Sequence, residues 1–159
     1  MKIPEAAAEF LRSQDFVIVS SLDKGGFPHS SCKAIVKIDP AAGIIHLIDV
    51  YHGVTGENIR RNSRISVSAV DEHKFTGYCL KGMAAIEPSG KIGSEMIKVW
   101  EEKITSRLAK RMLKNISRGK GQGHHPEANL PHPKYLILMK VEEVVDLAPQ
   151  HLKKGGLNG

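Results

Sequence analysis

The chain has 159 residues, of which 41% are hydrophobic and 25% are charged, so its length and composition favour one globular domain and exclude a wholly disordered chain. Two cysteines are too few for a disulfide framework, no apolar run approaches the roughly 18 residues of a membrane helix, and no signal peptide is evident, so we expect a cytoplasmic protein outside the membrane. The formal net charge is +6, and the whole excess lies in residues 98–120, where eight side chains are basic and two are acidic.

The first half of the chain predicts a short helix and three strands. The helix follows Pro4, and the strands cover residues 16–21, 29–38 and 44–49. The first strand, FVIVSS, shows no helical period and is interpreted as buried on both faces. The second strand alternates, with Ser31 and Lys33 on the face opposite to Cys32 and Ala34, because successive side chains of a strand point to opposite sides.

The second half predicts two helices and three more strands. A short helix covers residues 55–62, strands cover 65–70, 77–86 and 135–145, and a long helix begins near Ser94. The Ser94 hydroxyl is expected to cap the long helix. Apolar residues then recur every four positions from Met96 to Ile116. This spacing overshoots the turn of about 3.6 residues, so the helix should break or touch more than one surface.

These elements favour a mainly β fold with added helices. A closed or nearly closed antiparallel barrel is the simplest arrangement, because closure removes exposed strand edges. We expect a single domain over residues 1–159, with a core at about 14–148 and a flexible tail at 149–159.

The motifs of several common chemistries are not found in the sequence. There is no phosphate-binding loop, no dinucleotide fingerprint, no nucleophile elbow and no HExxH zinc motif. The histidine-rich segment at 124–132 matches no standard zinc spacing, so we expect no metal site. Cys32 and Cys79 are expected to be reduced thiols that pack as small apolar groups.

The order of several segments between residues 16 and 86 carries a resemblance to a known family. The chain reads FVIVSS, a Gly-Gly turn, FPHSSCKAIV, IIHLID, TGENIRRN and GYCLKGMAAI. In this order the segments resemble the pyridoxamine 5′-phosphate oxidase-like superfamily of FMN-binding split β-barrels, and most of all its small oxidase-related flavoproteins. The resemblance implies an antiparallel, Greek-key-like split barrel, with Tyr135–Leu147 as a further family strand. It also implies a homodimer with two FMN sites in grooves between the subunits.

The resemblance further implies which residues bind FMN. The predicted cofactor-binding residues are Ser31, Cys32, Lys33, Asp49, Val50, His52, Thr55 and Lys81. Ser31 and Lys33 would point outward to the flavin ring, and the Lys33 charge would stabilise the reduced ring. The turn that leads into Thr55 would hold the phosphate, because a helix N-terminus offers unpaired N–H groups and a positive dipole end.

One departure from the family pattern lies at the start of that helix. Family members commonly carry Lys or Arg at the position of Thr55 or directly before it, whereas this chain has Val54. His52, Arg60, Arg61 or a basic side chain of a second subunit are the alternatives for pairing the phosphate. The arginine-rich substrate motif of true pyridoxamine phosphate oxidases is not evident either, which counts against pyridoxamine phosphate as the substrate.

Three functions are compatible with this pattern. A flavin stores a hydride or two electrons, and the protein positions and tunes it. The first hypothesis is therefore an FMN-dependent oxidoreductase of flavin-reductase or nitroreductase type, with a small-molecule substrate and an electron donor such as NAD(P)H. The alternative is a non-enzymatic protein that binds a flavin or haem for storage or sensing. The least favoured is a nucleic-acid binder that uses the basic helix at 98–120, for which a solvated helix face is the simpler explanation.

Overall fold

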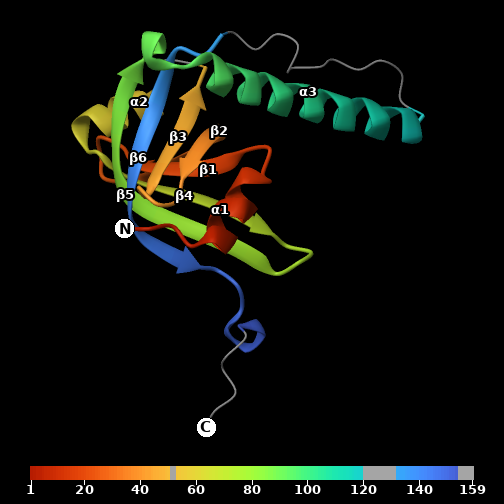
Figure 1. The fold of residues 1–159 in the computed structure, drawn as a ribbon, viewed down its shortest axis with the longest axis horizontal. Helices are drawn as coiled ribbons and strands as arrows, with labels where there is room; N and C mark the ends of the chain where they lie inside the picture. Colours follow the sequence, from red (N-terminus) through yellow and green to blue (C-terminus); the bar gives the residue numbers. More distant parts are fainter. Residues whose placement is uncertain (51–52, 120–131, 154–159) are drawn as a thin grey trace.

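The computed structural model describes residues 1–50, 53–119 and 132–153. Six antiparallel strands form a closed barrel in the order β1-β2-β3-β6-β5-β4 (Figure 1). The strands are β1 (Val17–Leu22), β2 (Pro28–Asp39), β3 (Ile44–Asp49), β4 (Arg64–Asp71), β5 (Thr76–Pro88) and β6 (Tyr135–Asp146). The helices are α1 (Glu5–Arg12), α2 (Val54–Arg61) and α3 (Ser94–Ser117), with 3-10 turns η1 (Ser89–Lys91) and η3 (Gln150–Leu152). The antiparallel barrel with helices that the sequence predicts is confirmed.

Strand β1 has one buried face rather than two. Val17 and Val19 point into the barrel and are fully buried, whereas Ile18 between them is 43% exposed. The prediction of a strand buried on both faces is wrong, because the barrel interior covers only one side of the strand. The apolar side chains on the other side are left at the surface.

The face of β2 that carries Ser31 and Lys33 is the inner face. Ser31 pairs with Val19, and Lys33 pairs with Val17. Directly paired residues of antiparallel strands project to the same side of the sheet, so both polar side chains point toward the barrel interior. Their expected outward orientation is therefore wrong.

A β-bulge explains why the alternation of β2 misleads. The register of β2 against β3 shifts between Ile35 and Lys37. Ile35 packs in the main core, and its neighbour Val36 is buried in a second cluster under α3. A bulge of this kind inserts an extra residue and reverses the inward and outward positions that follow it.

The pairing of β5 with β6 contains a second irregularity. Its register shifts between Lys81 and Gly82, and a Cβ atom at Gly82 would lie 2.0 Å from the carbonyl oxygen of Lys140. The two backbones therefore approach more closely than any side chain allows. Such bulges bend a strand and increase its twist, which a small barrel needs in order to close.

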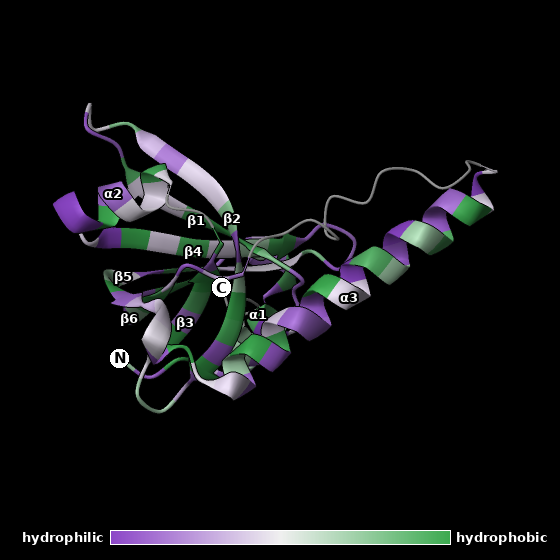
Figure 2. Cartoon of the chain, turned by 90° about the horizontal axis from the view of Figure 1, so that it is seen from above, coloured by the Kyte–Doolittle hydropathy of each residue, from purple (hydrophilic) through white to green (hydrophobic). Residues whose placement is uncertain are grey.

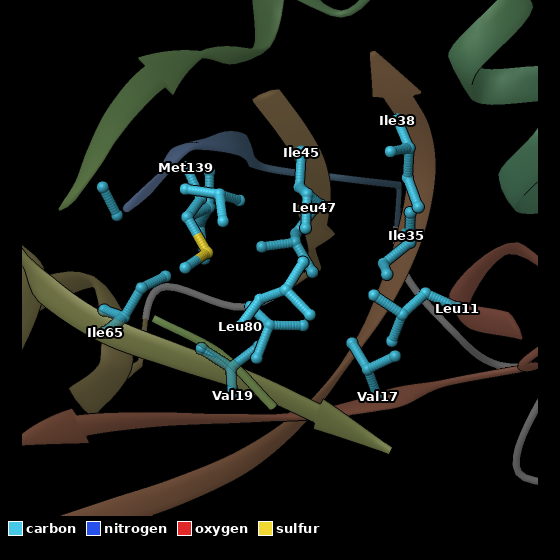
Figure 3. Close-up of a cluster of buried hydrophobic side chains, with 14 of the residues drawn as sticks. Leu11, Val17, Val19, Ile35, Ile38, Ile45, Leu47, Ile65, Leu80 and Met139 are labelled. Atoms are coloured by element: carbon cyan, nitrogen blue, oxygen red, sulfur yellow. The ribbon is translucent and has the colours of Figure 1, made fainter. Parts of the chain in front are cut away.

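Aliphatic side chains fill the barrel, as the low aromatic content requires (Figure 3). Val19, Leu80 and Met139 come from three different strands and have no exposed surface. Leu11 of α1 and Ile3 belong to the same cluster. The packed core thus begins before residue 14, earlier than the sequence suggested.

Helix α3 packs on the outside of the barrel and then extends away from it (Figure 2). Its first half contributes Met96, Trp100 and Ile104 to the second apolar cluster. In its second half Leu113 is 68% exposed and Ile116 is 72% exposed. The helix is continuous, and among the residues that the structure describes its apolar stripe packs on one surface of the barrel. The expected break is therefore not found, and the described part of the chain shows no second contact surface.

The long helix begins one position earlier than a cap at Ser94 would require. Gly93 occupies the N-cap position, Ser94 is the first helical residue, and no side chain caps the helix. The predicted Ser94 cap is therefore wrong. Within the described ranges, no helix is both long enough and apolar enough to cross a membrane.

The close approach at Gly82 generates a stability prediction. Gly82→Ala should lower the free energy of unfolding by about 1–3 kcal/mol, because the added methyl group forces the backbones of β5 and β6 apart. Denaturant unfolding followed by circular dichroism measures the loss. Gly90→Ala is the matched control, since a Cβ atom there meets nothing within 4 Å. Equal stability of the two variants would contradict the close approach.

Candidate functional site

A buried carboxylate joins three strands at one end of the barrel. The Asp49 side chain lies at the end of β3 and is 3% exposed. Its Oδ2 atom lies 2.9 Å from Nζ of Lys33 on β2 and accepts a hydrogen bond of 2.7 Å from the Tyr135 hydroxyl on β6. The Lys33 side chain is itself only 11% exposed. This is a desolvated ion pair with a third polar partner, an arrangement that persists only when its hydrogen bonds are well made.

The Tyr135 hydroxyl is fixed as a hydrogen-bond donor in this group. Burial raises the pKa of Tyr135, and its hydrogen bond to the Asp49 carboxylate raises that pKa further. The phenol therefore stays protonated at every physiological pH and continues to donate to Asp49. The sequence analysis missed Tyr135, which is 86 residues from Asp49 along the chain.

A second polar contact connects β2 to the start of α2. The Ser31 and Thr55 hydroxyl oxygens are 2.8 Å apart, and Thr55 is buried. Gly53 is the N-cap of α2, and no side chain caps the helix. Thr55 is therefore not the cap, and its hydroxyl group links the first turn of α2 to the barrel instead. The first turn of a helix carries the positive end of the helix dipole, which favours an anion.

Helix α2 is held in place by buried contacts that the sequence analysis did not identify. Asn58 donates to the Ser21 hydroxyl at 3.0 Å, and Arg61 donates to Oδ1 of Asn58 at 2.6 Å. A Cβ atom at Gly56 would lie 2.7 Å from the Tyr135 hydroxyl, so α2 rests directly on the group around Asp49. Arg61 also donates to the carbonyl of Leu22, which commits this cation to anchoring the helix.

A hollow opens beside the Lys33–Asp49 pair, between the barrel and α3. Its volume is about 180 Å³. It is lined by Asp15, Phe16, Cys32, Lys33, Ala34, Ile48, Asp49, Val50, Trp100, Ile104 and Arg107. Most of the lining residues are apolar, and the charged ones are Asp15, Lys33, Asp49 and Arg107. Trp100 is the only tryptophan of the chain, so its fluorescence reports on this hollow.

Four of the predicted residues, Cys32, Lys33, Asp49 and Val50, line this hollow. Ser31 and Thr55 contact each other but are not among its lining residues, and His52 lies outside the described residues. Cys32 is exposed and Cys79 is half-buried, both as free thiols, so the expected packing of Cys32 as a small buried group is wrong.

Lys81 is not brought to this hollow within one chain. Its ammonium lies 3.1 Å from both carboxylate oxygens of Glu143 on β6. It lines a different hollow, on the outer side of β1, β4 and β5, together with Arg64 and Ser66.

Among the described residues, no three His, Cys, Asp or Glu side chains cluster in a way that could hold a metal ion. Of the histidine-rich segment, only His132 falls within the described ranges.

The buried ion pair generates a prediction that a double-mutant cycle can test. Lys33→Met should lower the free energy of unfolding by about 3 kcal/mol, because Asp49 would remain buried without its cation. Adding Asp49→Asn removes the orphaned charge and keeps an acceptor for Tyr135, so the double variant should be more stable than Lys33→Met alone. Additive losses in urea unfolding would show that the two groups do not interact.

One family model matches most of the chain. Residues 3–147 match a family model described as pyridoxamine 5′-phosphate oxidase. No curated protein matches the chain.

Solved structures share the fold at low sequence identity. The conserved hypothetical protein Rv2991 from Mycobacterium tuberculosis gives a TM-score of 0.62 at 16% identity, over 100% of this chain and 94% of that one. HupZ from Group A Streptococcus gives 0.60 at 19% identity, over 92% and 94%. A Clostridium acetobutylicum protein of the pyridoxinephosphate oxidase family, related to general stress protein 26 of B. subtilis, gives 0.55 at 17% identity, over 92% and 94%. These likenesses establish the split-barrel fold.

Proposed function

This chain belongs to the pyridoxamine 5′-phosphate oxidase family, and we propose that it binds FMN and acts as an FMN-dependent oxidoreductase of flavin-reductase or nitroreductase type. The observation that carries the proposal is the position of the hollow beside Lys33 and Asp49. Asp49, which lines the hollow, is hydrogen-bonded to Tyr135, and the Tyr135 hydroxyl packs against the first turn of α2 at Gly56. An apolar hollow beside a helix N-terminus suits a ligand with a flat ring at one end and a phosphate at the other.

The start of α2 would hold the phosphate. The backbone N–H groups of its first turn and the Thr55 hydroxyl are donors at the positive end of the helix dipole. Val54 occupies the same turn and is 47% exposed, but it supplies no cation. Arg60 lies one turn further along and lines a neighbouring hollow with Lys134 and Tyr135, which makes it the nearest described substitute for the missing charge on α2.

The hollow between β2, β3 and α3 would hold the ring. When bound, FMN supplies the storage of a hydride or two electrons. The Lys33 ammonium would stabilise negative charge on the reduced ring, because it is fixed in a site from which water is largely excluded. The Asp49 carboxylate would act as a positioning residue, since it holds Lys33 in place through the contact of 2.9 Å.

We also propose that two copies form a homodimer with a site in each groove between them. The support is the apolar surface on the outer side of β1 and β4, where Phe16 is 44%, Ile18 43% and Val70 64% exposed. Burying these side chains against a second copy would stabilise the dimer, at roughly 25 cal/mol for each Å² of apolar surface. A second copy could also bring the Lys81 hollow to the cofactor, as the sequence prediction for Lys81 requires.

The start of α2 generates a ligand-binding prediction. Val54→Lys should tighten FMN about tenfold or more, because a charge-assisted contact to the phosphate contributes about 1.5–3 kcal/mol. Quenching of Trp100 fluorescence by added FMN measures the affinity. Riboflavin, which has no phosphate, should bind both proteins equally. Leu152→Lys is the matched control, since it places the same charge on an exposed leucine of η3, outside the proposed dimer surface. An FMN affinity unchanged by Val54→Lys would place the phosphate elsewhere.

One observation favours the alternative of a non-enzymatic flavin or haem binder. Lys33 already pairs with the buried Asp49, and this pairing offsets part of the positive charge available to a reduced flavin.

Hydride transfer distinguishes the two functions. The oxidoreductase should lose its flavin absorbance within seconds of anaerobic mixing with NADPH and recover it when an electron acceptor is added. A binder should keep the absorbance of the oxidised flavin after prolonged mixing. A haem absorbance band in the purified protein would instead contradict the flavin assignment.

A further inference from the structure

A second, strongly basic hollow runs along the projecting half of α3. Its volume is about 510 Å³. We call it the α3 groove, and it is lined by Asp15, Phe16, Arg107, Lys110, Arg111, Lys114, Asn115 and Arg118. Five of these eight side chains are cationic and one is anionic. The single acid, Asp15, already lies 2.6 Å from the ammonium of Lys110, so the groove presents a large excess of positive charge.

The basic side chains are gathered on one face of the helix. Arg107, Arg111, Lys114 and Arg118 follow one another at intervals of three or four residues, which places them above one another along a single face. The exposed apolar residues Met112 and Ile116 are not part of the groove. Like charges at this spacing destabilise an isolated helix, so an anionic ligand in the groove would offset a repulsion that the helix otherwise carries.

At the inner end of the groove, helix α3 contacts the segment that precedes β1. The half-buried Lys103 donates to the carbonyls of Arg12 and Gln14, and burial lowers the pKa of Lys103. The Arg107 guanidinium lies 5.2 Å from the centre of the Phe16 ring, a cation–π arrangement. The two segments that line the groove, α3 and residues 15–16, are thus held together at its inner end.

The α3 groove adjoins the candidate cofactor hollow. Asp15, Phe16 and Arg107 line both. A ligand whose reactive end enters the hollow can therefore place its other end among the cations of α3. Arg107 and Arg118 are eleven residues apart, which is about 16 Å along a helix that rises roughly 1.5 Å per residue. This length exceeds one phosphate and fits several negative groups spaced along an extended tail.

We propose that the α3 groove binds the polyphosphate tail of the substrate or electron donor that reacts in the hollow. The ligand class is a small molecule with a planar reactive group at one end and two or more phosphate charges along its length, such as a dinucleotide. The inference rests on the proposed function, because it takes the hollow to be the place of reaction. It adds a substrate class and the residues that select it, most of all Lys114 and Arg118 at the far end of the groove.

The test measures binding to the purified protein loaded with FMN, which blocks the start of α2 as a competing phosphate site. Titration calorimetry with pyrophosphate and with NADP⁺ gives the two affinities. The groove variant is Lys114→Gln with Arg118→Gln. The matched control removes the same charge from exposed lysines outside the groove, Lys24→Gln with Lys98→Gln. The groove variant should lose at least tenfold in affinity for both probes, and the control less than twofold.

A ligand that spans both cavities should also be seen from the hollow. NADP⁺ should change the emission of Trp100, whereas pyrophosphate, which is too short to reach it, should not. FMN affinity should be the same in the wild type, the groove variant and the control. Equal binding of NADP⁺ by the groove variant and the wild type, or no binding of either probe while FMN binds, would overturn the inference and leave the proposed function standing.

Two further outcomes separate the inference from its alternatives. If FMN does not bind but the groove variant still loses both probes, the proposed function fails and the anion site is supported. A short DNA duplex offers the macromolecular alternative, since it is also a polyanion. Duplex binding that is tighter than that of NADP⁺, falls steeply with salt and depends on Lys114 and Arg118 would overturn the small-ligand assignment in favour of a nucleic-acid surface.

Discussion

The burial of one carboxylate, Asp49, determines how the candidate site is built. A charge with 3% of its side chain exposed is tolerated only beside a cation and a hydrogen-bond donor. Lys33 and Tyr135 meet this need, and each comes from a strand that pairs with β3. Because Tyr135 also contacts the first turn of α2 across Gly56, the position of the helix N-terminus depends on the same group. Both ends of the proposed FMN site are thus tied to a single buried acid.

The closure of the barrel decides which surfaces remain for ligands and partners. Bulges in β2 and at Gly82 in β5 bend a six-stranded sheet until its edges meet. The interior is then filled by aliphatic side chains. The proposed ligand sites therefore lie at the outer side of the barrel, where α3 packs over β2 and β3 and the outer side of β1 stays exposed.

The sequence predicted local elements well and long-range contacts poorly. The strand at 44–49 and the helix that follows it have the predicted bounds within one residue, since turns and periodicity mark them directly. The face of Ser31 and Lys33 was assigned incorrectly, because the bulge after Ile35 is invisible to an alternation pattern. Tyr135 could not be connected to Asp49 by any local signal. Its one hint was a tyrosine directly before an apolar run at residues 136–139, where a buried hydroxyl needs a partner.

The charge distribution links the two ligand sites that the barrel exterior offers. At the start of α2, Val54 stands where the family commonly has a cation, so dipole, amides and hydroxyls would bind the proposed phosphate without a full charge. The excess positive charge of the chain lies instead in residues 98–120, within α3 and directly after it, and α3 borders the same hollow through Arg107. A localised field of this kind attracts anions over about 8–10 Å at physiological salt and raises their rate of encounter. The attraction acts on any anionic ligand that approaches the hollow, whereas a lysine at the start of α2 would act on the cofactor phosphate alone. The positive charge of this chain would therefore favour a second anionic ligand at the α3 groove over the cofactor phosphate at the start of α2.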